Sequence, residues 1–340
     1  MPCLIRSSGA VPELGDPLLD EYLRFTAARV RPNTVLAQGF DLKVFFTVVG
    51  KPPLEIAVGD VLGFIEAQRA PRRGANVIRL VDGEVGLAAS TIKRRLATIS
   101  SLYDYLVLRG HCDRNPVPRS MGARGQRASG AGAGGRRGAP LVRAPRKLPR
   151  VLTPAEVVAL TGALRTDRDR AMVALMVHGG LRRCEVLGLR FEDVHVGDRR
   201  VFIAEGKGGH QRLVPVADLF FTTLAGYLSR ERPQQADHDQ VFVVLKGPNR
   251  GKPLTAAGVD EILAGARRRA GLAHATCHEL RHTCFTRLRE GGMALEAIQA
   301  QAGHASIETT RVYLHLSNDW LAGEYHKAMA ILDAWDKEPT

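Results

Sequence analysis

The sequence predicts a mainly α-helical protein with a small antiparallel β-sheet, an α+β fold divided into two domains. Its 340 residues are more than one domain usually holds. Apolar residues recur at helical spacing along most of the chain, whereas paired strands are predicted only around a glycine-rich turn after residue 200. A glycine- and arginine-rich segment with few apolar residues separates the two helical regions.

Residues 16–116, which follow an N-terminal tail of residues 1–15, are predicted to be all helical. Asp16 followed by Pro17 favours a helix start, because aspartate caps a first turn and proline fits the opening position. A second helix is expected from Asn33 and a third after Asp60. The second helix has three phenylalanines available for a core: Phe40, Phe45 and Phe46.

A fourth helix is predicted to begin near Ser90 with one apolar stripe. Its apolar residues step along the chain by four, three, four and three positions: Ile92, Leu96, Ile99, Tyr103 and Leu106. The other faces carry Lys93, Arg94 and Arg95. Such a run of charge is either the solvated side of a helix or a surface that faces a nucleic-acid groove, and we predict these three cations as DNA-binding residues.

Residues 117–150 break the helical pattern. They contain nine arginines or lysines, seven glycines and no acidic residue, against a formal net charge of +13 for the whole chain. Such a segment cannot build a core and predicts a flexible cationic linker. The linker is either a spacer or a strap across a phosphate backbone, and in the second case Arg136 and Arg137 are candidate DNA-binding residues.

The remaining residues, 151–340, are predicted to form a second domain with a C-terminal helix. It opens with a helix capped by Thr153 and Glu156. A buried helix, DRAMVALMVHGG, ends at its glycine pair. The stretch RVFIAEGKGGHQRLVPV predicts two strands around a turn with Lys207 at its tip. Further expected elements are a strand at 241–245, a helix at 255–270 and mostly helical structure up to Trp335.

The charge and the cysteines limit the class of protein. A net charge of +13 and a pI near 10.0 indicate a polyanionic partner, either nucleic acid or an anionic membrane surface, unless the basic surface only serves solubility. No apolar run approaches the roughly 18 to 20 residues that span a bilayer. The N-terminal residues lack an apolar export signal, and five cysteines without paired spacing indicate reduced thiols, so we expect a cytoplasmic protein.

The stretch CHELRHTCF has two incompatible interpretations. His278-Glu279-x-x-His282 has the spacing of two zinc-binding imidazoles on one helical face. The same letters give His278-x-x-Arg281, one helical turn apart, which suits a phosphate. Arg281 would repel a dication beside either histidine, and Phe285 stands where an extended zinc motif has glycine. We therefore expect no metal here and a structural or supporting role for His282.

Four motifs in order resemble the catalytic domain of the tyrosine recombinase (phage integrase) family, over about residues 151–335. The helical region 16–115 also resembles that family's core-binding domain. The motifs are GLRRCEVLGL at 180–189, EGKGG at 205–209, HELRH at 278–282 and GHASIETTRVYLHL at 303–316. Each motif is weak alone, and the joint match in this order is specific.

The chemistry of these residues fits phosphodiester cleavage. A tyrosine hydroxyl attacks a phosphodiester if its proton is removed and the phosphate charge is neutralised. Two guanidiniums, Arg182 and Arg281, could clamp the nonbridging oxygens. Lys207 could protonate a leaving 5′ oxygen, and His278 could take the proton of the nucleophile.

The resemblance implies six catalytic residues: Arg182, Lys207, His278, Arg281, His304 and Tyr313. It implies that Tyr313 is the nucleophile of a 3′-phosphotyrosyl intermediate, that Glu185 supports the site by hydrogen bonding, and that neither ATP nor a metal is needed. Each residue also has a structural interpretation. Arg183 stands beside Arg182, and Tyr227 and Tyr325 are other tyrosines that a site could use.

The expected function is site-specific DNA recombination, in integration and excision, as in mobile elements, or in resolution of DNA. The alternatives are a DNA-binding protein that does not cleave, a type IB topoisomerase-like enzyme, and, remotely, a zinc metalloprotease.

The apolar residues of WLAGEYHKAMAILDAW predict a C-terminal helix. Family recombinases pass such a helix to a neighbouring subunit, which implies a tetramer on DNA, although the helix could instead pack on its own domain. The long linker departs from the family pattern, and the short N-terminal tail favours the compact two-domain type.

Overall fold

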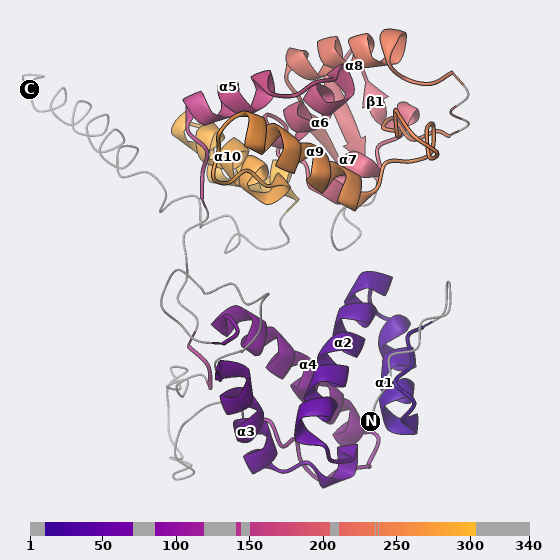
Figure 1. The fold of residues 1–340 in the computed structure, drawn as a ribbon, viewed down its shortest axis with the longest axis vertical. Coiled ribbons are helices and arrows are strands. Elements are labelled where there is room, and N and C mark those ends of the chain that lie inside the picture. Colours follow the sequence, from indigo (N-terminus) through magenta and orange to yellow (C-terminus); the bar gives the residue numbers. More distant parts are fainter. Residues whose placement is uncertain are drawn as a thin grey trace, which may run out of the picture. The chain divides into compact units, whose positions relative to one another are not determined.

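The computed structural model describes residues 11–70, 86–118, 141–143, 150–204, 211–234, 236 and 238–303. These residues fall in two compact units, which lie within residues 1–146 and 147–340 (Figure 1). The described elements are mostly helices, with one three-stranded antiparallel sheet, which confirms the predicted fold class. Of the described helices, none combines the length and the apolar content needed to cross a bilayer.

The first unit is a bundle of helices around α2, which packs against the other three (Figure 1). Its elements are α1 (Pro17–Ala27), α2 (Pro32–Val49), the short 3-10 helix η1 (Pro53–Glu55), α3 (Val58–Arg69) and α4 (Ala89–Leu108). The Asp16 side chain accepts hydrogen bonds from the backbone N–H groups of Leu18 and Leu19, so the predicted start of the first helix is confirmed. All five apolar residues of the predicted stripe on α4 are buried.

The prediction of a core position for Phe40 is wrong. Phe45 and Phe46 are buried on α2, whereas Phe40 is 45% exposed. Phe40 precedes Phe45 by five positions, which is about 140° around an α-helix, so the two rings leave the helix in different directions. Phe45 instead meets Phe46 and Phe64 edge to face.

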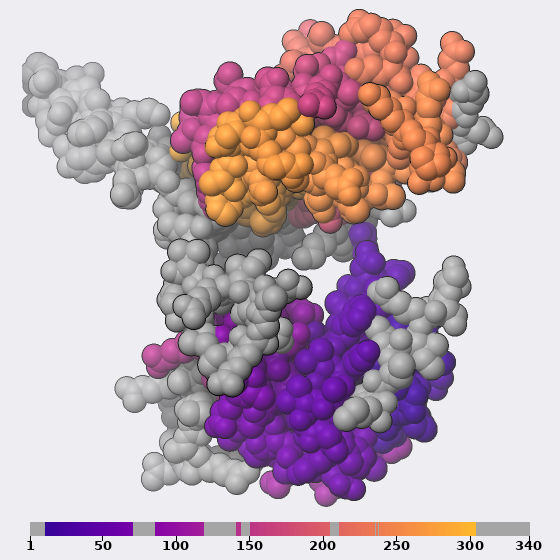
Figure 2. All heavy atoms as spheres, in the orientation of Figure 1, coloured from indigo at the N-terminus to yellow at the C-terminus, as the bar shows by residue number. Residues whose placement is uncertain are grey.

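The second unit consists of helices packed about α6, together with a small sheet (Figure 1). Its helices are α5 (Pro154–Gly162), α6 (Asp167–Val177), α7 (Arg183–Leu187), η2 (Phe191–Asp193), α8 (Asp218–Arg230), α9 (Ala256–Arg269), α10 (Cys277–Glu290) and α11 (Leu295–Ala302). Residues 171–177 of α6 are all buried, and this helix packs against α8 and α10. In Figure 2 the orange and yellow surface that includes α9 and α10 lies against the magenta surface that includes α5. The core of the unit therefore surrounds α6.

The sheet has the order β1-β2-β3 and is antiparallel throughout. Its strands are β1 (Val194–His195), β2 (Arg200–Ile203) and β3 (Arg212–Pro215). The predicted hairpin is confirmed, with Val201 opposite Val214 and Ile203 opposite Arg212. The turn at 205–210, with Lys207, lies outside the described residues. The predicted strand at 241–245 is wrong, because Val243 makes only an isolated bridge to Pro253.

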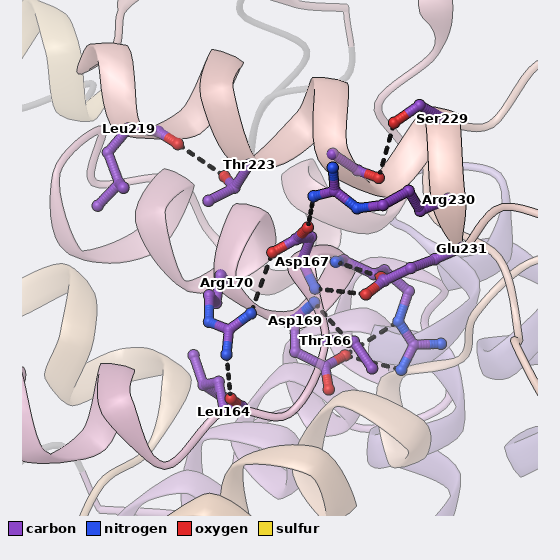
Figure 3. A network of polar contacts seen from close by, with 12 residues as sticks. Leu164, Thr166, Asp167, Asp169, Arg170, Leu219, Thr223, Ser229, Arg230 and Glu231 are labelled. Carbon is purple, nitrogen blue, oxygen red and sulfur yellow. Dashed lines mark hydrogen bonds and ion pairs between the residues drawn. The ribbon is translucent and has the colours of Figure 1, made fainter.

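A network of charged side chains joins the start of α6 to α8 (Figure 3). Asp167 accepts hydrogen bonds from Arg170 at 3.0 Å and from Arg230 of α8 at 2.6 Å. Glu231, which follows α8, accepts the backbone N–H groups of Asp167 and Arg168 at 2.9 and 3.0 Å. Two carboxylates thus lie at the N-terminus of α6, where the helix dipole favours negative charge. The network fixes the central helix against its main neighbour.

Candidate active site

Arg182 lies at the N-cap of α7, immediately after a sharp turn. Its backbone N–H donates to Oε2 of Glu185 and its guanidinium Nη1 donates to Oε1, both at 2.8 Å. Arg183, the neighbouring alternative, instead forms an ion pair with Asp260 of α9. The two arginines therefore have different partners, and Arg182 is the one that binds the acidic residue of its own motif.

Glu185 is the centre of a cluster of arginines. Its side chain is fully buried, and Arg212 of β3 binds it with both terminal nitrogens, Nη1 to Oε1 and Nη2 to Oε2, each at 3.0 Å. Nη1 of Arg281 lies 3.9 Å from Oε2 of Glu185. Burial raises the pKa of Glu185, but the hydrogen bonds from Arg212 and from the Arg182 backbone outweigh it and leave the pKa lowered. One carboxylate thus faces three guanidiniums, and the cluster keeps a net positive charge.

Arg281 is held on α10 by carbonyl groups from two distant segments. Its guanidinium donates to the carbonyl oxygen of Gly180 and, at 2.7 Å, to that of Ala302, the last residue of α11. The same guanidinium lies over the ring of Phe285, 4.8 Å from its centroid. Gly180 has a φ of 68°, and a Cβ there would overlap the Phe285 ring. The glycine of the Gly-Leu-Arg motif is thus required by backbone conformation and by space.

Arg212 was not among the residues predicted from the sequence. Besides binding Glu185, its Nε donates to the carbonyl oxygen of Gln301 at 2.8 Å. Two arginines therefore bind the last carbonyls of α11, where the helix dipole favours cations. A signal was present in the sequence: Arg212 alternates with Leu213 and so shares the inward face of β3 with the buried Val214. A charge on that face requires a buried partner.

His278 and His282 lie one turn apart on α10 and contact each other. Their Nε2 atoms are 2.8 Å apart, and their rings are nearly perpendicular, with centroids 4.2 Å apart. Burial, Arg281 and Arg182 lower the pKa of His278, against the opposing influence of Glu279. Burial, together with the neighbouring His278 and Arg281, lowers the pKa of His282 to about 4. Both imidazoles are therefore predominantly neutral at pH 7.

The geometry of this pair is that of a hydrogen bond. With Zn–N distances of about 2.0–2.1 Å and tetrahedral angles, two nitrogens that share a zinc ion lie roughly 3.3 Å apart. The two Nε2 atoms are closer than that, and Arg281 lies between the histidines in sequence and near both. Within the described part of the chain, no group of three histidine, cysteine or acidic side chains is arranged to hold a metal ion.

The described residues bring together four of the predicted site residues, namely Arg182, Glu185, His278 and Arg281. Five other predicted residues lie outside the described part of the chain: Lys207, His304, Tyr313, Arg136 and Arg137. Tyr227 is buried, and its hydroxyl donates to the Val241 carbonyl at 3.1 Å, so it belongs to the core. Gly303, which caps α11 in a left-handed conformation, directly precedes His304 in sequence.

The three cations predicted to bind DNA on α4 differ in accessibility. Lys93 is exposed. Arg94 is 52% exposed in its side chain and pairs with the buried Asp41 of α2. The Arg95 side chain is only 13% exposed, and its guanidinium binds Gln68 of α3 and lies 3.7 Å from Asp41. Burial raises the pKa of Asp41 more than Arg94 and Arg95 lower it. DNA contact by Lys93 and Arg94 stays a prediction, whereas Arg95 is bound inside the bundle.

Comparison with known proteins places the site in a family context. The model of the phage integrase family matches residues 150–319. Tyrosine recombinase XerC of Xylella fastidiosa is 33% identical over 279 residues, which cover 80% of this chain and 83% of the relative. Transposase A from transposon Tn554 of Staphylococcus aureus is 29% identical over 317 residues, 87% of this chain and 86% of the relative.

Solved structures share the fold. The Tn1549 transposon integrase in complex with transposon right end DNA matches with a TM-score of 0.65 and 16% identity, over 92% of this chain and 98% of that one. A lambda integrase dimer bound to a COC′ core site matches with a TM-score of 0.59 and 21% identity, over 86% of this chain and 95% of that one. At these identities the likeness concerns the fold.

Proposed function

Because the chain belongs to the phage integrase family of tyrosine recombinases, we propose that it is a site-specific DNA recombinase that cleaves and rejoins double-stranded DNA. The reaction passes through a 3′-phosphotyrosyl intermediate. The relatives named tyrosine recombinase support this activity over binding without cleavage, over topoisomerase-like relaxation and over proteolysis. The integrase structures solved with DNA support a DNA partner.

One observation carries the assignment of the site: Arg182 and Arg281 converge on the buried Glu185, although 98 residues of sequence lie between them. Their convergence supports the proposal that both guanidiniums donate hydrogen bonds to one phosphate and match the charge that grows on the nonbridging oxygens in the transition state. Glu185 holds the guanidiniums in place. It does not neutralise their positive charge, because Arg212 adds a third guanidinium to the cluster.

In the proposed reaction the phenolic oxygen of Tyr313 attacks the phosphorus, and its proton passes to His278. The bond from phosphorus to the 5′ oxygen breaks, and Lys207 gives that oxygen a proton. A 5′ hydroxyl of the partner strand then attacks the phosphotyrosine, loses its proton to Lys207 and releases the tyrosine, which recovers its proton from His278. His304 donates a hydrogen bond to the same phosphate. The number of phosphodiester bonds is unchanged, so no nucleotide cofactor is consumed.

The working assembly is proposed to be a tetramer on two DNA duplexes. The apolar C-terminal helix predicted from WLAGEYHKAMAILDAW supports exchange of that helix between copies. Lys93 and Arg94 on α4 are proposed to contact the duplex, and the cationic linker with Arg136 and Arg137 is proposed to bind its phosphates. Integration and excision of mobile DNA, or resolution of DNA, are the reactions that such an assembly performs.

The test is covalent trapping on a nicked suicide substrate. Wild-type protein is expected to form a protein–DNA adduct that resists denaturant and persists in EDTA. Tyr313→Phe should form none while it retains DNA binding, whereas Tyr325→Phe serves as the matched control and should form the adduct. An adduct with Tyr313→Phe, or chelator-sensitive activity, would refute the assignment.

A further inference from the structure

The two histidines of α10 share a single hydrogen bond through their Nε2 atoms, which are 2.8 Å apart. In such a contact one ring must donate N–H and the other must accept it, because two N–H groups or two lone pairs would repel each other. The Nε2 atom of His278 is thus committed to His282. Its Nδ1 atom is the ring nitrogen that remains for a substrate.

The surroundings of the two rings differ. His278 is exposed, whereas His282 is only 9% exposed. On its own helix, Arg281 lowers the pKa of His278 and Glu279 raises it. Arg182, at the start of α7, also lowers this pKa. Besides burial, His278 and Arg281 lower the pKa of His282. When the pair takes up one proton, the charge is better solvated on the exposed ring than on the buried one. The charged state therefore has N–H on both nitrogens of His278, with Nε2–H directed at a neutral His282.

We propose that His282 is a positioning residue that accepts the Nε2–H of His278 and thereby leaves Nδ1 of His278 as the atom that takes the nucleophile's proton. The role of His282 in the reaction rests on the proposed function, whereas the hydrogen bond between the two rings does not. As the oxygen–phosphorus bond forms, the phenolic proton moves to Nδ1, and His278 becomes an imidazolium whose charge is stabilised by the Nε2–H···Nε2 bond. In the rejoining step Nδ1 returns the same proton to the departing phenolic oxygen.

The spectroscopic test requires no activity. The full chain is labelled with ¹⁵N in its histidines, and one- and two-bond ¹⁵N–¹H correlation spectra are recorded near pH 7. The expected spectrum of His278, assigned by comparison with His278→Gln, has a protonated Nε2 and an unprotonated Nδ1. In His282→Phe, which keeps a ring but lacks an acceptor, the His278 signals should move to a mixture of the two tautomers. A His278 that carries its proton on Nδ1 in the wild-type spectrum would overturn the proposal.

The kinetic test uses single-turnover cleavage of the nicked substrate. His282→Phe should lower the cleavage rate roughly 10- to 100-fold with an unchanged Kd for DNA. His282→Gln, whose side-chain oxygen can accept the same hydrogen bond, should recover a substantial part of that loss. His274→Phe, at an exposed position before α10, is the matched control and should cleave at the wild-type rate.

The outcomes separate the two proposals. If no variant of the chain forms an adduct, the proposed function fails, and the tautomer of His278 still tests the hydrogen bond. If adducts form and His282→Phe cleaves as fast as wild type, the role of His282 is refuted. Should His282→Phe fail to fold, His282→Gln and the wild-type spectrum still decide the matter.

Discussion

Arg212 binds both carboxylate oxygens of Glu185 at 3.0 Å, across 27 positions of sequence, and so joins β3 to α7. The same guanidinium holds the Gln301 carbonyl at the end of α11. Arg212 therefore connects α7, whose N-cap is Arg182, with α11, which ends two residues before His304 in the sequence.

Arg212→Met should destabilise the second unit by about 3–5 kcal/mol, because it leaves a buried carboxylate with fewer partners. Arg212→Lys should destabilise it less, yet it should still slow cleavage, since lysine cannot bind two oxygens and a carbonyl at once. Denaturant unfolding and single-turnover cleavage measure the two effects. An Arg212→Met protein with wild-type stability would contradict the role given to this contact.

The same contact predicts a pH dependence of folding. The pKa of Glu185 in the folded protein lies below its ordinary value of 4.5, so its ionised contacts stabilise the protein above that pH. This stabilisation should be lost as the pH falls through the lowered pKa. In Glu185→Gln, unfolding measured from pH 7 down to acidic pH should lose less stability than in the wild type. Parallel curves for the two proteins would count against the interpretation.

Gly180→Ala should be destabilising for two reasons, the left-handed backbone and the overlap with Phe285. Gly271→Ala is the matched control, because Gly271 has a similar φ of 67° but no atom within 4 Å of an added Cβ. The control should lose about 1–2 kcal/mol from conformation alone. Unfolding midpoints should rank wild type, Gly271→Ala and Gly180→Ala in descending order, and equal losses at the two glycines would refute the steric argument.

Neighbouring cations on α4 should respond differently to substitution. Lys93→Ala should weaken DNA binding and reduce the slope of log Kd against log salt by about 1, with stability unchanged. Arg95→Ala should instead lower stability, because its guanidinium binds Gln68 within the bundle. Fluorescence anisotropy at several salt concentrations, together with thermal unfolding, distinguishes them. A salt slope that responds to Arg95 alone would reverse the assignment.

Charge removal in the linker tests its role as a strap. Replacement of Arg136 and Arg137 by glutamine should flatten the salt dependence of DNA affinity, because fewer counterions are released on binding. The same anisotropy titrations measure the slope. A slope that stays at the wild-type value would leave the linker as a spacer.

Local patterns in the sequence predicted most of the described fold. The stripe on α4 needs only helical periodicity, and its five residues are buried. The hairpin needs only a turn and alternating strands, and β2 and β3 pair as expected. The run at 241–245 shows the limit of such patterns, since a short apolar stretch fits a buried strand or a buried loop equally well. The sheet contacts that would decide between them are not local.

The candidate site was predictable where a motif carries its own partner. Arg182 and Glu185 are three positions apart and form one capped turn. His278 and His282 are four positions apart, so one helical turn brings their rings into contact. Arg212 required knowledge of the fold, because its partners are brought to it by packing of α7 and α11. The direction of the hydrogen bond between the histidines depends on burial, which sequence spacing does not contain.

The sharing of Glu185 among Arg182, Arg212 and Arg281 has an evolutionary consequence. A lineage that loses Glu185 is left with three crowded cations, whereas one that loses Arg212 leaves both oxygens of a buried carboxylate with fewer hydrogen-bond donors. Positions 185 and 212 should therefore mutate in concert across descendants of this scaffold, with paired replacements far commoner than single ones.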